Sequence, residues 1–218
     1  MKLAIKIGGS MAIGEHGFKP EYIDKLIPVI NKVKQKTEKL ILGIGGGKFV
    51  RNYYTSIRKF LSEDQMEWLG IDLLKANARF LAYVFNGKPV FDMGNIPDSN
   101  VLVIAGIEPG RSTDANTALL AEKFHADIFI ILTDVDGIYD KDPDKYSDAV
   151  LFDKIKFDEL EKFIQKKTGP GDYGVIDPLA LKVIKRSNVH TFTINGNRPE
   201  NILKILQGKK IGTEICES

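Results

Sequence analysis

Short apolar runs alternate with longer amphipathic segments along this chain of 218 residues. The runs are rich in β-branched residues and short enough to be buried strands, whereas the longer segments repeat their apolar residues at the helical period. Strands are predicted at residues 2–7, 39–44, 100–105, 127–132, 190–194 and 211–215, with a short extended piece at 89–91. Helices are predicted at residues 20–36, 48–61, 64–85, 114–124, 158–167, 178–187 and 199–206. This alternation predicts an α/β protein with a mostly parallel sheet that is covered on both faces.

Two of the predicted strands run directly into glycine turns, at residues 8–10 and 45–47. Consecutive glycines allow positive φ angles and let the backbone lie close to a ligand. The helix after such a turn directs its first amides and the positive end of its dipole toward an anion. Ligands of open α/β sheets bind at the carboxyl ends of the strands, so the two turns are expected to form one ligand-binding edge. One turn would hold a donor phosphate and the other the acceptor.

The second glycine turn matches neither of the two common glycine motifs for phosphate binding. A P-loop requires Gly-Lys-Ser/Thr, but here Phe49 follows Lys48, and the dinucleotide fingerprint requires a glycine where Lys48 stands. Arg51 falls near the first turn of the next helix, where a guanidinium could grip a phosphate with two hydrogen bonds. Taken alone, the turn could instead be a tight strand-to-helix connection without a ligand.

Lys6 lies in an apolar strand immediately before the first glycine turn. Lysine is rarely buried without a partner, so Lys6 is either a solvent-facing residue of an edge strand or a cation that reaches a phosphoryl group. Thr113 and Asp114 begin the helix after strand 100–105, and an N-cap role would explain either one. Asp114 would also lie at the carboxyl edge of the sheet. A carboxylate there could hold lysines in place for phosphoryl transfer, which depends on positioning and charge stabilisation.

The segment Thr133–Tyr139 follows the most apolar strand of the chain. Its Asp136-Gly137 pair predicts either a plain turn or a nucleotide-binding loop with Tyr139 beside the base. Lys182, on the helix at 178–187, is by itself typical of a surface lysine. The three histidines are scattered and Cys216 is remote from them, so the sequence has no metal-binding spacing.

Composition narrows the class of protein. Hydrophobic residues make up 43% of the chain, which suits one large α/β domain with an ample core. The formal net charge is +2 with interspersed charges, so no nucleic-acid or membrane partner is expected. The single cysteine cannot form a disulfide within the chain, no signal peptide is recognised, and no apolar run has membrane-spanning length. We therefore expect a cytoplasmic protein.

The order and spacing of these segments resemble the amino acid kinase superfamily, and most closely its archaeal-type uridylate (UMP) kinases. Each matching segment is a weak signal alone, but together they span nearly the whole chain. They are Lys6-Ile-Gly-Gly-Ser10, Gly45-Gly-Gly-Lys-Phe-Val-Arg51, Gly70-Ile71, Ala76-Asn77-Ala78, Pro109-Gly-Arg-Ser-Thr-Asp114, Ala118-Leu-Leu-Ala-Glu122, Thr133-Asp-Val-Asp-Gly-Ile-Tyr139, Asp142-Pro143 and Ile176-Asp-Pro-Leu-Ala-Leu-Lys182.

The resemblance implies a three-layer αβα sandwich with a largely parallel central sheet. It implies a single domain over residues 1–218, with acceptor binding at about 1–125 and ATP binding at about 126–218. The implied reaction transfers the γ-phosphoryl group of ATP, which carries Mg²⁺, to UMP, giving UDP in pyrimidine nucleotide synthesis. A phosphate acceptor is already ionised, so no strong general base is needed. Such enzymes are usually hexamers built from dimers, which predicts a homo-oligomer.

The resemblance also implies roles for individual residues. Lys6 and Lys182 would neutralise the transferring phosphoryl group, and Asp114 would organise the two lysines. The residues on the ATP side would be Gly8, Gly9, Ser10, Thr133, Asp136, Tyr139, Asp142 and Pro143. The residues on the UMP side would be Gly46, Gly47, Arg51, Glu67, Gly106, Ser112 and Thr113. No metal ion bound by protein side chains is predicted.

Two positions depart from the family pattern in the acceptor site. Glu67 stands where the family usually has an aspartate for the ribose hydroxyls, and the longer carboxylate could still accept those hydrogen bonds. Ile107 stands where many relatives have a threonine close to the uracil. Because its side chain can neither donate nor accept a hydrogen bond, either uracil recognition uses the backbone or Ser112 and Thr113, or the acceptor is not UMP.

Two alternative functions follow from the same residues. One is a sister kinase that acts on another small phosphate or carboxylate, such as isopentenyl phosphate. The absence of a histidine from the second glycine turn argues against that acceptor. The other alternative is a catalytically inactive regulator that binds nucleotides, and the retention of Lys6, Asp114 and Lys182 together argues against it.

Overall fold

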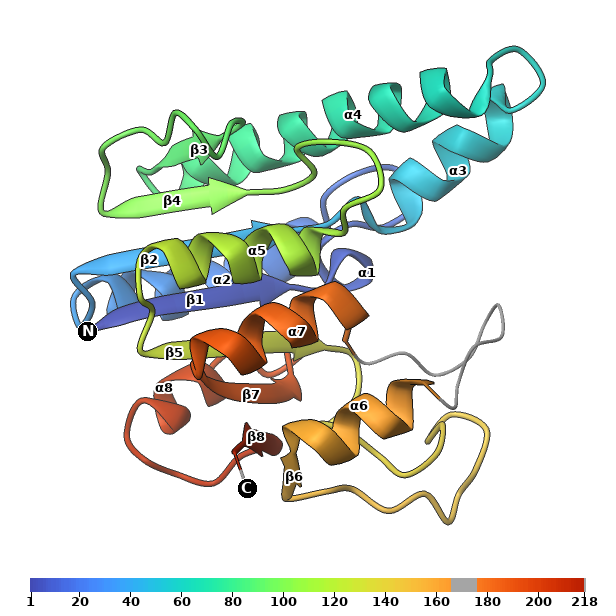
Figure 1. The fold of residues 1–218 in the computed structure, drawn as a ribbon. Helices are drawn as coiled ribbons and strands as arrows, with labels where there is room; N and C mark the ends of the chain where they lie inside the picture. The colour runs from blue at the N-terminus through green and yellow to red at the C-terminus, as the bar shows by residue number, and fades with distance from the viewer. Residues whose placement is uncertain (166–175, 218) are drawn as a thin grey trace.

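The computed structural model describes residues 1–165 and 176–217 (Figure 1). The strands are β1 (Lys2–Ile7), β2 (Lys39–Ile44), β3 (Lys88–Val90), β4 (Val101–Ile104), β5 (Ile128–Thr133), β6 (Lys154–Lys156), β7 (His190–Asn195) and β8 (Thr213–Cys216). The helices are α1 (Gly9–Ala12), α2 (Pro20–Lys34), α3 (Gly47–Ile57), α4 (Glu63–Val84), α5 (Thr113–Lys123), α6 (Phe157–Gln165), α7 (Pro178–Ser187) and α8 (Asn201–Ile205).

The predicted elements are present, with ends displaced by a few residues. The short helix α1 and the short strand β6 were not predicted, because neither is long enough to establish a period. In β6, Ile155 is the only apolar residue and lies between two lysines. The last two residues of the helix predicted at 158–167 lie outside the described residues.

All eight strands form one sheet in the order β3-β4-β2-β1-β5-β7-β8-β6. Neighbouring strands pair in parallel, except that β7 and β8 are antiparallel. The register pairs Lys6 of β1 with Gly43 of β2 and with Ile131 of β5. The prediction of a largely parallel sheet is confirmed, and β1 lies between the two strands that border the candidate site.

Helices cover both faces of the sheet, so the protein has three layers (Figure 1). On one face, α2, α4 and α8 pack over alternate residues of the central strands, such as Leu3 and Ile5. On the other face, α5, α6 and α7 pack over the intervening residues, such as Ala4 and Ile131. Burial on both faces explains why these strands are continuous apolar runs. The predicted αβα sandwich is therefore confirmed.

Helix starts follow the expected local chemistry. Pro20 occupies the first turn of α2, where a missing amide proton costs nothing. The α4 start has a capping box, in which the Ser62 side chain accepts from the Gln65 amide and the Gln65 side chain accepts from the Ser62 amide. Asp177 caps α7 and precedes Pro178. These caps fix the points at which α4 and α7 begin.

Candidate active site

The two predicted glycine turns lie against each other at the carboxyl ends of β1 and β2. A Cβ atom placed on Gly9 would lie 2.6 Å from the amide nitrogen of Gly47. Gly47 has a φ of 62°, and a Cβ atom there would lie 2.6 Å from the carbonyl oxygen of Gly9. Both positions require glycine because the two backbones touch. The predicted convergence of the turns is therefore observed.

The backbone amides of the first turn differ in what they can bind. The Gly8 amide donates to the carbonyl of Leu132 at 3.0 Å, so it belongs to the sheet. The amides of Gly9 and Ser10 begin α1 and have no acceptor within that helix. Two donors at this position suit an anion such as a phosphate.

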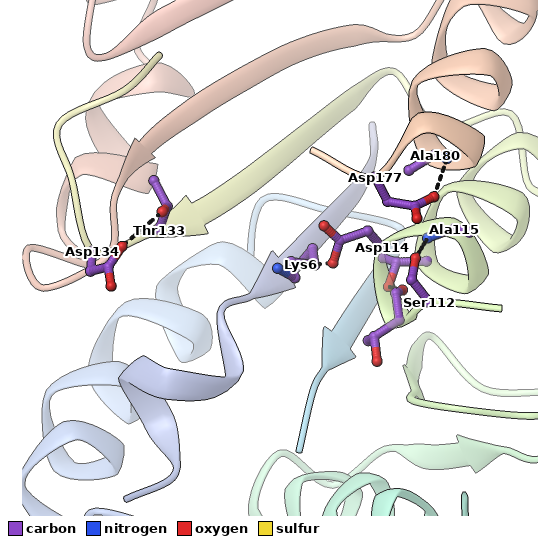
Figure 2. A network of polar contacts seen from close by, with 10 residues as sticks. Lys6, Ser112, Asp114, Ala115, Thr133, Asp134, Asp177 and Ala180 are labelled. Atoms are coloured by element: carbon purple, nitrogen blue, oxygen red, sulfur yellow. Dashed lines mark hydrogen bonds and ion pairs between the residues drawn. The ribbon is translucent and has the colours of Figure 1, made fainter. Parts of the chain in front are cut away.

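Lys6 reaches across the sheet edge to Asp114 at the start of α5 (Figure 2). Its Nζ lies 2.9 Å from Asp114 Oδ1, and each side chain is only 17% exposed. α5 approaches the sheet closely because Gly43, beside Lys6, has no side chain: a Cβ atom there would lie 1.9 Å from Thr117 Oγ1. The ion pair therefore depends on a glycine in the neighbouring strand.

The cap of α5 is Ser112, not Thr113 or Asp114. Ser112 Oγ accepts from the Ala115 amide at 3.0 Å (Figure 2). Asp114 lies in the first helical turn, where the helix dipole favours a negative charge. Because Ser112 satisfies the helix terminus, the Asp114 carboxylate is available for Lys6.

A cavity of about 570 Å³ surrounds these groups. It is bounded by the carboxyl ends of β1, β2 and β5 and by the starts of α3 and α5. The predicted site residues that line it are Lys6, Gly8, Gly9, Ser10, Gly46, Gly47, Arg51, Ser112, Thr113, Asp114 and Thr133. One cavity thus collects residues assigned to catalysis, to ATP and to UMP, which is the arrangement that a transfer between two bound phosphates requires.

Further residues line the same cavity without having been predicted. They are Val50, Tyr54, Leu74, Arg111, Asp134, Ile176 and Asp177, together with Gly45 and two β5 residues, Ile131 and Leu132. Asp134 accepts from Thr133 Oγ1 at 3.1 Å, and Asp177 accepts from the Ala180 amide at 2.9 Å (Figure 2). Asp134 directly follows a strand at the ligand-binding edge, a signal that could have found it. The other positions carry no such signal.

Comparison with known proteins assigns the chain to a family. The profile described as "Amino acid kinase family" matches residues 1–195. The chain belongs to the amino acid kinase family. The resemblance noted from the sequence motifs is thereby confirmed.

Individual relatives within this family are similar over their full length. A uridylate kinase of Methanobrevibacter smithii is 36% identical, with 99% of each chain covered. The crystal structure of uridylate kinase from Archaeoglobus fulgidus has a TM-score of 0.83 and 34% identity, covering 99% of this chain and 100% of that chain. An isopentenyl phosphate kinase of T. acidophilum has a TM-score of 0.68 at 22% identity, covering 99% of this chain and 100% of that chain, and shares the fold.

Several residues that the family resemblance assigned to ATP lie outside the cavity. Asp136 accepts from the side chains of Asn195, which ends β7, and of Arg198, which follows that strand. Asp142 begins a turn, where its carboxylate accepts from the Asp144 amide at 3.0 Å. Pro143 continues this turn, and Tyr139 forms a β-bridge with Leu151. Burial and then the charge of Asp136 raise the pKa of Tyr139. These contacts organise the loop after β5, and the predicted ATP contacts stay a prediction.

Lys182 also lies outside the cavity. It is exposed on α7, whereas Asp177, at the start of that helix, lines the cavity. The structure therefore brings together two of the three residues predicted to be catalytic, Lys6 and Asp114. The role of Lys182 stays a prediction.

Two glycines predicted on the UMP side pack tightly against apolar side chains. A Cβ atom on Gly106 would lie 2.5 Å from a methyl carbon of Leu74, and one on Gly46 would lie 2.7 Å from Val50. Ile107 packs against the apolar core beneath α5 and does not line the cavity. Its side chain therefore stabilises the loop after β4, and Gly106 is adjacent to Leu74 at the cavity edge.

Proposed function

We propose that this protein is a UMP kinase that transfers the γ-phosphoryl group of ATP to UMP, giving ADP and UDP. The observation that carries the proposal is the Lys6–Asp114 ion pair inside a cavity bordered by both glycine turns. Full-length similarity to uridylate kinases at 34–36% identity supports the same substrate. Residues up to about 125 would form the acceptor-binding part, and residues from about 126 the ATP-binding part, with the first glycine turn also reaching the ATP phosphates.

The reaction is an in-line displacement at the γ-phosphorus. An oxygen of the UMP phosphate forms a bond to that phosphorus while the bond to the β,γ-bridging oxygen of ATP breaks, and ADP leaves with the electron pair. Arg51 and the turn at Gly46 and Gly47 would hold the acceptor phosphate. The Lys6 ammonium would neutralise charge on the transferring group while Asp114 fixes its position.

The nucleotide would bring the metal as MgATP. Among residues 1–165 and 176–217, no group of three or more His, Cys, Asp or Glu side chains is arranged to hold a metal ion. Mg²⁺ prefers to keep substrate phosphates and water among its ligands. Asp134 and Asp177 supply carboxylates in the cavity that are compatible with such a complex.

The test is a coupled assay of ADP release with MgATP and a panel of acceptors. The panel contains UMP, CMP, dUMP, AMP, isopentenyl phosphate and carbamate. Selective turnover of UMP is the expected result. Turnover of another acceptor without UMP would contradict the assignment, and binding of ATP without any turnover would favour a regulator.

We further propose that the protein is a homo-oligomer of the cytoplasm. Large aromatic side chains are exposed on and beside α3 and α4, including Phe60 at 70%, Trp68 at 53% and Tyr83 at 70%. Exposed large apolar side chains can mark a protein interface. In the described part of the chain, no helix has the length and apolar character needed to cross a membrane. Light scattering after size exclusion would measure the assembly, for which a hexamer is expected.

A further inference from the structure

Tyr54 lies on the acceptor side of the cavity, one helical turn beyond Arg51. Both residues belong to α3 and line the cavity. Residues three apart share a helix face and are offset by about 4.5 Å along the axis. If Arg51 holds a 5′-phosphate, Tyr54 is therefore placed beside the next part of a nucleotide, the sugar.

The position of the Tyr54 ring is set by Gly70 of α4. A Cβ atom on Gly70 would lie 1.6 Å from the Tyr54 hydroxyl oxygen and 2.5 Å from the ring carbon that carries it. Any other residue at position 70 would displace the tyrosine. Glycine inside a helix costs about 1 kcal/mol relative to alanine. A glycine in the interior of α4 is thus explained by the tyrosine packed on it.

Glu67 lies one turn before Gly70 on α4 and does not line the cavity. Burial and, second, the charge of Glu67 raise the pKa of Tyr54, so the phenol stays protonated at neutral pH. A phenol can donate one hydrogen bond and accept others. The protonated phenol can therefore donate to or accept from a hydroxyl of a ligand in the cavity.

We propose that Tyr54 contacts the sugar of the acceptor nucleotide and makes the enzyme prefer ribonucleotides to 2′-deoxyribonucleotides. The inference rests on the proposed function, because it needs a nucleoside monophosphate as acceptor. It differs from the family expectation in one respect. Tyr54 lines the cavity and Glu67 does not, so the sugar contact is assigned to the tyrosine.

The test compares kcat/KM for UMP and dUMP in the wild-type protein and in Tyr54→Phe. The phenylalanine ring keeps the contact with Gly70, and thermal denaturation checks that the fold is retained. Loss of one hydrogen bond should lower kcat/KM for UMP about fivefold to tenfold, with dUMP changed less than twofold. Tyr53→Phe is the matched control, because Tyr53 is adjacent, 37% exposed and absent from the cavity lining. An unchanged UMP/dUMP ratio in Tyr54→Phe would overturn the inference.

A second variant separates Tyr54 from Glu67. If Glu67 acts through Tyr54, Glu67→Gln should lower the UMP/dUMP ratio less than Tyr54→Phe does. Adding it to Tyr54→Phe should then have no further effect. Multiplied losses in the double variant would instead assign the sugar contact to Glu67. A wild-type protein that uses only an acceptor without a sugar would refute the proposed function along with this inference, whereas UMP turnover with an unchanged ratio refutes the inference alone.

Discussion

The Lys6–Asp114 pair allows a quantitative prediction. At 2.9 Å and an effective dielectric of about 20, the Coulomb attraction is about 6 kcal/mol, and desolvation of both largely buried groups offsets much of it. Replacing Lys6 by methionine removes the cation while keeping the length of the side chain. Loss of one preorganised group that stabilises transition-state charge should lower kcat by about 10²–10³-fold. The KM for UMP should change by only a few-fold, since the acceptor phosphate is held elsewhere.

Asp114→Asn should lower kcat by about 10–100-fold, because Lys6 keeps its charge but loses its anchor. If Asp114 acts only by positioning Lys6, the double variant should be no worse than Lys6→Met alone. The assay is ADP release with MgATP and UMP, with kcat and KM determined separately and thermal denaturation as a folding check. Lys2→Met is the matched control, because Lys2 begins the same strand and pairs with the exposed Glu38. Undiminished turnover in Lys6→Met, or losses that multiply in the double variant, would refute this reasoning.

Other substitutions test separate parts of the site. Gly9→Ala should destabilise the fold by about 1–3 kcal/mol and abolish ATP binding, because the methyl group would meet the Gly47 backbone. A melting temperature and an ATP affinity equal to those of the wild-type protein would contradict this. Arg51→Lys should raise the KM for UMP about tenfold, since lysine cannot form two parallel hydrogen bonds to phosphate. An unchanged KM for UMP in this variant would exclude that role for Arg51. Ser112→Ala should cost about 1 kcal/mol in the free energy of unfolding, and denaturant titration that finds no loss would show that the cap is dispensable.

The central part of the site was predictable from sequence because it depends on the sheet. Parallel strands end at one edge, so two glycine turns and the residue just before one of them must come together. Lys6 precedes the first turn by two to four residues, and their position follows from the strand itself. Asp114 follows from the same rule, since its helix begins after β4.

The loop after β5 shows where prediction from sequence ends. Asp136 lies in a motif typical of nucleotide binding, yet its carboxylate accepts from Asn195 and Arg198, which are 59 and 62 residues later in the chain. Contacts of this kind depend on β5 and β7 being neighbours, and the sheet order cannot be derived from the hydrophobic pattern. The N-cap residue of α5 was predicted wrongly for a local reason. Ser, Thr and Asp occur in succession at 112–114, and each is a good N-cap.

The acceptor end illustrates a different limit, because it is built by contact between two helices. Nothing in the sequence pairs Tyr54 with Gly70, and a glycine inside a long amphipathic segment appears only as a cost to the helix. The structure explains why position 70 is glycine, since the Tyr54 ring occupies the space that a side chain there would fill. Lys6 is fixed by strand register and Asp114 by the packing of α5 on Gly43, whereas Tyr54 can be exchanged together with position 70. Changes of acceptor within this fold should therefore be found in α3 and α4, while the groups that act on the transferring phosphate stay the same.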